Sequence, residues 1–210
     1  MIATSTTDPV KFTPSWLAKE DNPPIFYLRA GSSIERGLME AELAGEHMAG
    51  EIGSHEVREA VLNGVEQLFA GDAEYDRIVS VVTAEPEEVD AFTLGDKALS
   101  EAVYRMLGTH WAPYRELLAR RARRQQLAPL IALQRFCAGW ENVKTEKGDL
   151  IAFARDPRGF VSEAALVKLP RYDMLAAGNR AYAMQFGGGE EKNSEQPSAS
   201  GEGQMTSQEG

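Results

Sequence analysis

The sequence is poor in the residues that make covalent cross-links and metal sites. It contains one cysteine, Cys137, and three histidines among 210 residues. One thiol cannot form an intramolecular disulfide, and Cys137 lies in the apolar run 133–139, where a buried structural thiol is the usual interpretation. A chain of this length buries enough surface to fold without cross-links, so the composition indicates a reducing compartment.

Long apolar runs are also absent. No stretch approaches the roughly 18 consecutive apolar residues of a membrane-spanning helix, and the first residues lack the basic and apolar regions of a signal peptide. We therefore expect a cytoplasmic protein that does not bind membranes. The formal net charge of −10 disfavours broad binding to nucleic acid and favours solubility or a basic protein partner.

None of the histidines belongs to a pattern typical of a metal site. His47, Glu51 and His55 follow one another at four-residue steps, which would align three ligands on an unbroken helix. Gly50 and Gly53 interrupt that helix, so the interpretation that we prefer is two surface histidines near a helix break. We predict no bound metal.

Catalytic constellations are equally scarce. Cys137 and His110 would form a nucleophile and a base only if folding brought them together, and spacing suggests no third group to orient them. No glycine-rich loop has the pattern that cradles phosphate. We therefore predict that the protein is not an enzyme and holds no cofactor.

Apolar periodicity and capping residues predict a mainly α fold. We expect a single helical domain, 24–186, of about six to eight helices with a short strand or small hairpin. An extended N-terminal arm, 1–23, precedes it, and an acidic tail rich in Gly, Ser and Glu, 187–210, follows and is expected to be disordered. The expected elements are a strand at 25–28, helices at 32–48, 54–70, 72–83, 96–111, 113–137 and 170–186, an acidic loop at 84–92, and a hairpin around the turn 156–159.

The first expected helix carries two clear signals. Ser32 and Glu35 have the spacing of a capping box, in which each side chain binds the other residue's backbone N–H. Apolar residues at three- and four-residue steps then form one stripe. Its members are Ile34, Leu38, Ala41, Gly45 and Met48.

The long helix 113–137 reverses the acidic character of the chain, and Pro129 is expected to kink it or divide it in two. Three interpretations of its basic ridge remain open. The arginines pair with the protein's own acidic helices, or they dock an acidic partner helix, or they bind nucleic acid; the last is disfavoured because aromatic residues do not alternate with the arginines. The ridge consists of Arg115, Arg120, Arg121, Arg123, Arg124 and Arg135.

Aromatic residues flank the ridge at both ends. Trp111 and Trp140 each stand beside a helix break, where they either pack in the core or form part of a groove for a partner helix. The predicted partner-binding region therefore comprises Trp111, Arg120, Arg121, Arg124 and Trp140.

Three segments of the chain resemble the tail assembly chaperones of long-tailed bacteriophages and prophages. The resemblance is one of pattern and layout, covers most of the chain from Phe12 to Phe186, and contains no diagnostic motif. The segments are FTPSWLAKEDNPPIFYLRAGSSIERGLMEAELAG (12–45), HWAPYRELLARRARRQQLAPLIALQRFCAGWENV (110–143) and LPRYDMLAAGNRAYAMQFG (169–187).

The resemblance implies a non-catalytic chaperone in the host cytoplasm. Such a protein binds the long helical tape measure protein, the major tail protein, or both, and assists tail-tube assembly. Members often exist in a short and a frameshifted long form, and self-association is compatible with the sequence. The alternative is a structural virion protein, such as a tail or head-completion component, which would be retained in purified particles.

Overall fold

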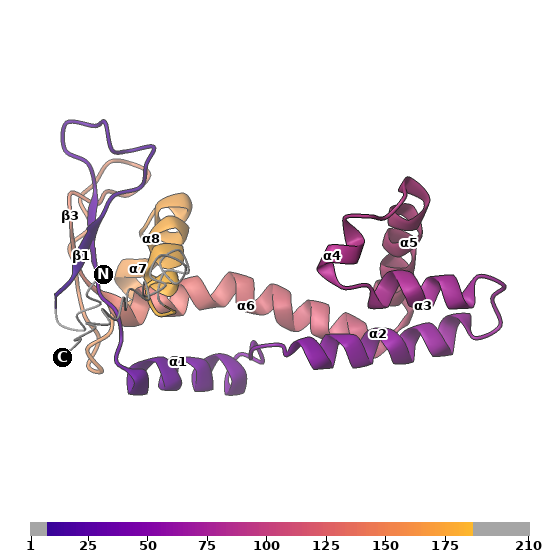
Figure 1. Ribbon diagram of the computed structural model, residues 1–210. Coiled ribbons are helices and arrows are strands. Elements are labelled where there is room, and N and C mark those ends of the chain that lie inside the picture. Colours follow the sequence, from indigo (N-terminus) through magenta and orange to yellow (C-terminus); the bar gives the residue numbers. More distant parts are fainter. Residues whose placement is uncertain (1–7, 187–210) are drawn as a thin grey trace, which may run out of the picture.

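The computed structural model describes residues 8–186, and the predicted disordered tail and the first seven residues of the arm lie outside this range. The chain is mainly helical with one small sheet, which confirms the predicted fold class (Figure 1). The elements are β1 (Val10–Phe12), β2 (Ile25–Leu28), α1 (Ser33–Gly45), α2 (Ser54–Phe69), α3 (Tyr75–Thr83), α4 (Pro86–Val89), α5 (Leu94–His110), α6 (Ala112–Phe136), β3 (Cys137–Glu141), α7 (Glu163–Leu166) and α8 (Arg171–Ala183).

Helix α6 runs between two separate groups of buried side chains and connects them. At its carboxyl end, the sheet, α1, α7 and α8 surround the first group, which we call the sheet core (Figure 1). At its amino end, α2, α3 and α5 enclose the second group, the helical core. The helical core consists of Val61, Val65, Ile78, Val103 and Leu107.

The sheet is antiparallel in the order β1-β2-β3, with β2 in the centre. The predicted strand 25–28 is confirmed as β2. The arm contributes an edge strand, β1, which the sequence did not predict, and β3 extends the long helix directly into the sheet. The predicted hairpin at 150–161 forms a turn and isolated bridges without named strands. Asp156 accepts from the backbone N–H groups of Arg158 and Phe160 in that turn.

Helix α1 begins with the predicted capping box. Ser32 Oγ accepts from the Glu35 N–H at 3.2 Å, and the Glu35 carboxylate accepts from the Ser32 N–H at 2.8 Å. The same carboxylate pairs with both terminal nitrogens of Arg29, at 2.5 and 3.1 Å. The hydrogen bond from Arg29 is the largest of the influences that hold the pKa of Glu35 at about 2, below its ordinary value of 4.5.

We expect Glu35→Gln to lower stability by about 1 kcal/mol or less at pH 7, because the carboxylate is partly exposed and screened by solvent. A lowered folded-state pKa stabilises the protein above the unfolded value and loses that effect as the pH falls through the folded value. The difference between variant and wild type should therefore shrink between pH 4.5 and about 2 in urea titrations. Glu101→Gln, at an exposed position of α5, is the control. A difference that does not vary with pH would contradict the assignment.

The apolar stripe of α1 faces solvent, although such a stripe ordinarily faces the core. Met39 and Leu43 are the buried residues of this helix, on the side opposite the stripe. Ion pairs explain the orientation, since Glu40 binds Arg124 and Glu42 binds Arg135 of α6. The acidic side of α1 is thus turned inward and the predicted stripe outward.

The helical core follows the predicted pattern with local corrections. Helix α3 begins at Tyr75, later than expected, and the acidic loop 84–92 contains a helical turn, α4. The cap of α5 is Thr93, whose hydroxyl accepts from the Asp96 N–H, so the helix begins before the expected start at 96. Asp96 instead completes the capping box as its third helical residue.

Helix α6 runs through Pro129 without division, so of the two predicted outcomes, a kink or a division, the division was wrong. Helix α8 packs across α6 at this point. Gly178 lies so close that a Cβ added to it would stand 2.5 Å from the Pro129 carbonyl oxygen. Glycine is needed here for the close approach of the two backbones.

A buried glutamine connects the end of α8 to the segment between β2 and α1. Gln185 is fully buried, accepts from the Gly31 N–H at 2.7 Å and donates to the Ala181 and Arg29 carbonyls at 2.6 and 3.3 Å. Satisfied buried polar groups of this kind specify one arrangement of the segments that they join. The side chain therefore fixes the end of α8 against the segment that joins β2 to α1.

None of the helices in the described range has both the length and the apolar character needed to cross a bilayer.

Candidate protein-binding groove

Two adjoining cavities lie along α6 and share the side chains of Arg121 and Arg124. The first, of about 300 Å³, opens between α6 and the start of α2. The second, of about 370 Å³, opens between α6 and α8. We call the two together the α6 groove. The remaining lining residues are Glu51, Ile52, Val57, Tyr114, Leu117 and Leu118 in the first and Gln125, Ala128, Pro129, Asn179 and Tyr182 in the second.

The α6 side of the groove is one face of the helix. Its residues recur at steps of three and four from Tyr114 to Pro129, so the face is about 22 Å long at 1.5 Å per residue. This length matches about four turns of a docked helix. The recurrence was visible in the sequence, but the prediction considered only the arginines and tryptophans and missed the apolar residues between them.

The arginines of the ridge play different parts. Arg124 pairs with Glu40 at 2.8 Å and donates to the Tyr182 hydroxyl at 2.9 Å and the Ala49 carbonyl at 3.2 Å. Arg120 pairs with Glu56 of α2. These residues hold helices together, as the interpretation that the arginines pair with the protein's own acidic helices predicts. Arg123 and Arg135 also form ion pairs, with Glu116 and Glu42.

Arg121 differs from these neighbours. Its side chain is exposed where the two cavities meet, and none of the carboxylates whose side chains the structure describes forms an ion pair with it. A guanidinium that the fold does not use is available to a carboxylate of another molecule. Among the five predicted contact residues, Arg121 is therefore the one best suited to bind a partner.

The two tryptophans do not come together at the groove. Trp140 is buried in the sheet core, where its indole N–H donates to the Ile151 carbonyl at 2.8 Å. Trp111 packs against the helical core and donates to the Ala60 carbonyl at 2.8 Å. A Cβ on Gly64 would stand 2.6 Å from the Trp111 ring, which shows how closely the indole seats on α2. Trp140 serves the fold alone, whereas Trp111 is half-buried and also lines a cavity of about 270 Å³ that adjoins the groove at Leu117.

The groove combines apolar and hydrogen-bonding groups. Burial raises the pKa of Tyr114 and of Tyr182, so both phenols remain neutral hydrogen-bonding groups near pH 7. The described residues that line the two cavities include neither histidine nor cysteine. The groove thus offers apolar surface together with guanidinium, amide and phenol groups and the carboxylate of Glu51.

Of the residues considered for metal binding and nucleophilic catalysis, Glu51 lines the groove and the others do not. His47, Glu51 and His55 do not share a helix, because α1 ends at Gly45 and α2 begins at Ser54. Ligand atoms of Glu42, Glu46 and His47 lie within 4.8 Å of one another, but Arg135 already pairs with Glu42 and neutralises its charge.

The cysteine is not placed for nucleophilic catalysis. Cys137 is buried in the sheet core, and burial raises the pKa of its thiol to about 11. A thiol of this kind is protonated and inert at neutral pH. His110 lies on the last turn of α5, at the opposite end of α6.

No protein-family model matches the sequence, and no match was found among the curated proteins or the solved structures. The resemblance to tail assembly chaperones therefore stays a hypothesis.

Proposed function

We propose that this protein binds a helical segment of another protein in the α6 groove and acts without catalysis. The observation that carries the proposal is the exposed, unpaired Arg121 at the junction of two apolar cavities within the described chain. An amphipathic helix would place its apolar face against Leu117 and Leu118 and a carboxylate against Arg121. Affinity would come from apolar burial, and Arg121 would set the register of the helix.

We further propose that the protein is an assembly chaperone of the phage tail type that its sequence resembles. Its partner would be the tape measure protein, a long helical and aggregation-prone chain, and its place of action would be the host cytoplasm. A groove about four helical turns long supports this proposal, because it suits reversible contact with many similar helical segments. The acidic surface elsewhere would keep the complex soluble.

Co-expression tests the proposal. We expect the soluble fraction of a tape measure protein encoded beside this gene to rise when both are expressed. Arg121→Glu should weaken the interaction about tenfold, because it replaces a charge-assisted hydrogen bond with repulsion. The readouts are the soluble yield and the amount of tape measure protein that copurifies.

The control is Arg105→Glu, at an exposed position on α5 outside the groove. Arg120 and Arg124 are unsuitable for this test, because their substitution would also break the ion pairs to α2 and α1. Equal solubility with and without the protein would contradict the chaperone proposal. Equal effects of Arg121→Glu and Arg105→Glu would exclude the groove as the contact surface.

A further inference from the structure

The outward stripe of α1 is apolar and exposed. Ile34 is 77% exposed and Leu38 57%, Ala41 and Gly45 are also exposed, and Met48, three residues beyond the end of the helix, is 65% exposed. Figure 1 shows α1 along an outer edge of the molecule, with its far side uncovered by other labelled elements. Contiguous apolar surface of this kind marks interaction sites, because exposure to water is unfavourable.

The orientation of α1 is fixed by ion pairs. Arg29, Arg124 and Arg135 bind the three carboxylates on its inner and lateral sides, at Glu35, Glu40 and Glu42. Rotation of the helix to bury the stripe would break these pairs and leave partly buried guanidinium groups without partners, which is unfavourable. The chain therefore holds the apolar face outward.

Nothing in the described part of the chain requires glycine at two positions of α1. A Cβ added to Gly37 or to Gly45 would meet nothing within 4 Å, and neither residue has a positive φ. A glycine inside a helix lowers stability relative to alanine, so open space alone does not favour it. With Ala41 they form a row of small residues at four-residue steps, which lets another helix approach closely.

We propose that α1 is the interface of a symmetric dimer, in which the α1 helices of two copies pack antiparallel about a two-fold axis near Ala41. This proposal is independent of the α6 groove. Within α1 the stripe is large at its amino end, with Ile34 and Leu38, and small in its second half, with Ala41 and Gly45, while Met48 follows after the helix has ended. An antiparallel pair therefore sets Leu38 of one copy against the small residues of the other and Ile34 near its Met48, so the stripe meets itself in apolar contacts, as a two-fold interface requires.

Charge allows two copies to meet on this face. The carboxylates at its edges, Glu35 and Glu42, are already neutralised by arginines of their own chain. Two acidic chains can therefore approach here without repulsion between like charges at the contact.

The contact area between the two copies indicates how strongly the dimer associates. Helix α1 is about 20 Å long, so the contact buries roughly 400 Å² per copy, about half of that in a typical stable interface. We expect a dimer that dissociates on dilution.

Sedimentation of the full chain tests the dimer. The average mass should rise toward twice the monomer mass from low to high micromolar concentration, and Leu38→Glu should abolish the rise. Leu94→Glu, at a leucine that is 88% exposed at the start of α5, is the matched control and should behave as wild type. A wild-type chain that stays monomeric at the highest concentration would overturn the proposal.

Cysteine cross-linking tests the geometry. Cys137 is buried, so Ala41→Cys introduces the reactive thiol. Residues beside a two-fold axis face their own copies, and this variant should form a disulfide-linked dimer under mild oxidation. Ala102→Cys, exposed on α5, should remain largely monomeric. Equal cross-linking by both variants would contradict the arrangement.

The co-expression assay separates this proposal from the function of the groove. Leu38→Glu should leave the solubilisation of the tape measure protein unchanged while it abolishes the dimer. If Leu38→Glu instead abolishes copurification and the wild-type protein is monomeric, the stripe binds a different chain and the dimer is wrong.

Discussion

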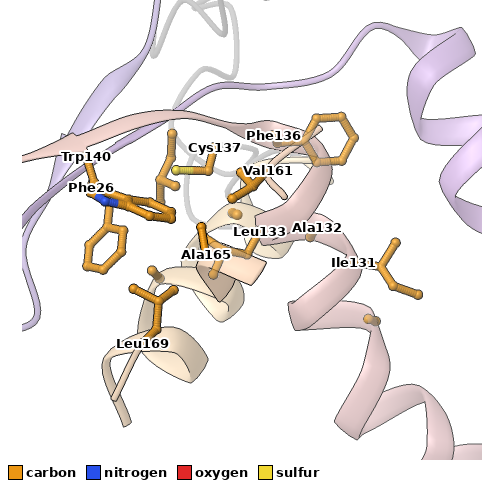
Figure 2. Packing of buried hydrophobic residues seen from close by; sticks show 14 of the residues in the cluster. Phe26, Ile131, Ala132, Leu133, Phe136, Cys137, Trp140, Val161, Ala165 and Leu169 are labelled. Atoms are coloured by element: carbon orange, nitrogen blue, oxygen red, sulfur yellow. The ribbon is translucent and has the colours of Figure 1, made fainter. Parts of the chain in front are cut away.

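Replacement of Trp140 by alanine should lower the free energy of unfolding by about 3–5 kcal/mol, the range for removal of a large aromatic side chain from a core. The indole is 7% exposed and meets two rings nearly edge to face, Phe26 at 6.2 Å and Phe153 at 4.9 Å between centroids. Figure 2 shows it beside Phe26 and near Cys137 in the packed interior. Alanine would leave a cavity in place of the indole and would remove all of these contacts. Chemical denaturation followed by circular dichroism measures the loss.

Two further variants separate packing from hydrogen bonding. Trp140→Phe keeps a ring in place but leaves the Ile151 carbonyl without its donor, which should cost about 1–3 kcal/mol. Trp16→Ala is the control, because that indole is 56% exposed and makes one hydrogen bond, to Asp173 at 3.2 Å. Because its loss also leaves the buried Asp173 carboxylate without this donor, it should cost about 1–3 kcal/mol, less than Trp140→Ala. Equal small effects of Trp140→Ala and Trp16→Ala would contradict the burial of Trp140 in the sheet core. They would favour the interpretation in which Trp140 forms part of a groove.

Signals confined to a few neighbouring residues were sufficient for much of the fold. The capping box at Ser32 and Glu35 and the turn at 156–159 depend on contacts within four residues, and both formed as predicted. Strand β2 was likewise predictable from its β-branched and aromatic residues. Strand β3 was not, because Cys137–Glu141 has no alternating pattern and becomes a strand by pairing with β2, more than 100 residues earlier in the chain.

The direction in which α1 faces could not be predicted from periodicity. A stripe at three- and four-residue steps shows that a helix has two unlike faces, but not which of them is buried. Which face of α1 is buried depends on the partners of Glu40 and Glu42, which are 84 and 93 residues away on α6. The same pairs explain why the arginine ridge is only partly available to other molecules: among the described side chains, Arg121 has no ion pair and Arg115 binds only the Thr109 carbonyl.

Replacement of Gly178 by alanine should lower the free energy of unfolding by about 2–3 kcal/mol, toward the upper end for overpacking. The added Cβ would stand 2.5 Å from the Pro129 carbonyl oxygen and 2.9 Å from its carbon. A flexible side chain could rotate away, but a backbone carbonyl inside α6 cannot, so α8 would have to move outward. That movement would loosen the buried contacts of Ala177 and Ala181 and displace Tyr182, which lines the groove. Denaturant titration and the thermal midpoint both report the loss.

Gly108→Ala is the matched control for this prediction. Gly108 also lies within a helix, but a Cβ added there would meet the Leu118 side chain at 3.5 Å, an ordinary van der Waals distance. Alanine is the better helix former, so this variant should gain up to about 1 kcal/mol. The two substitutions remove the same conformational entropy from the unfolded chain, and opposite signs therefore report the packing difference alone. If both variants were stabilised, α6 and α8 would have to lie farther apart than the structure places them.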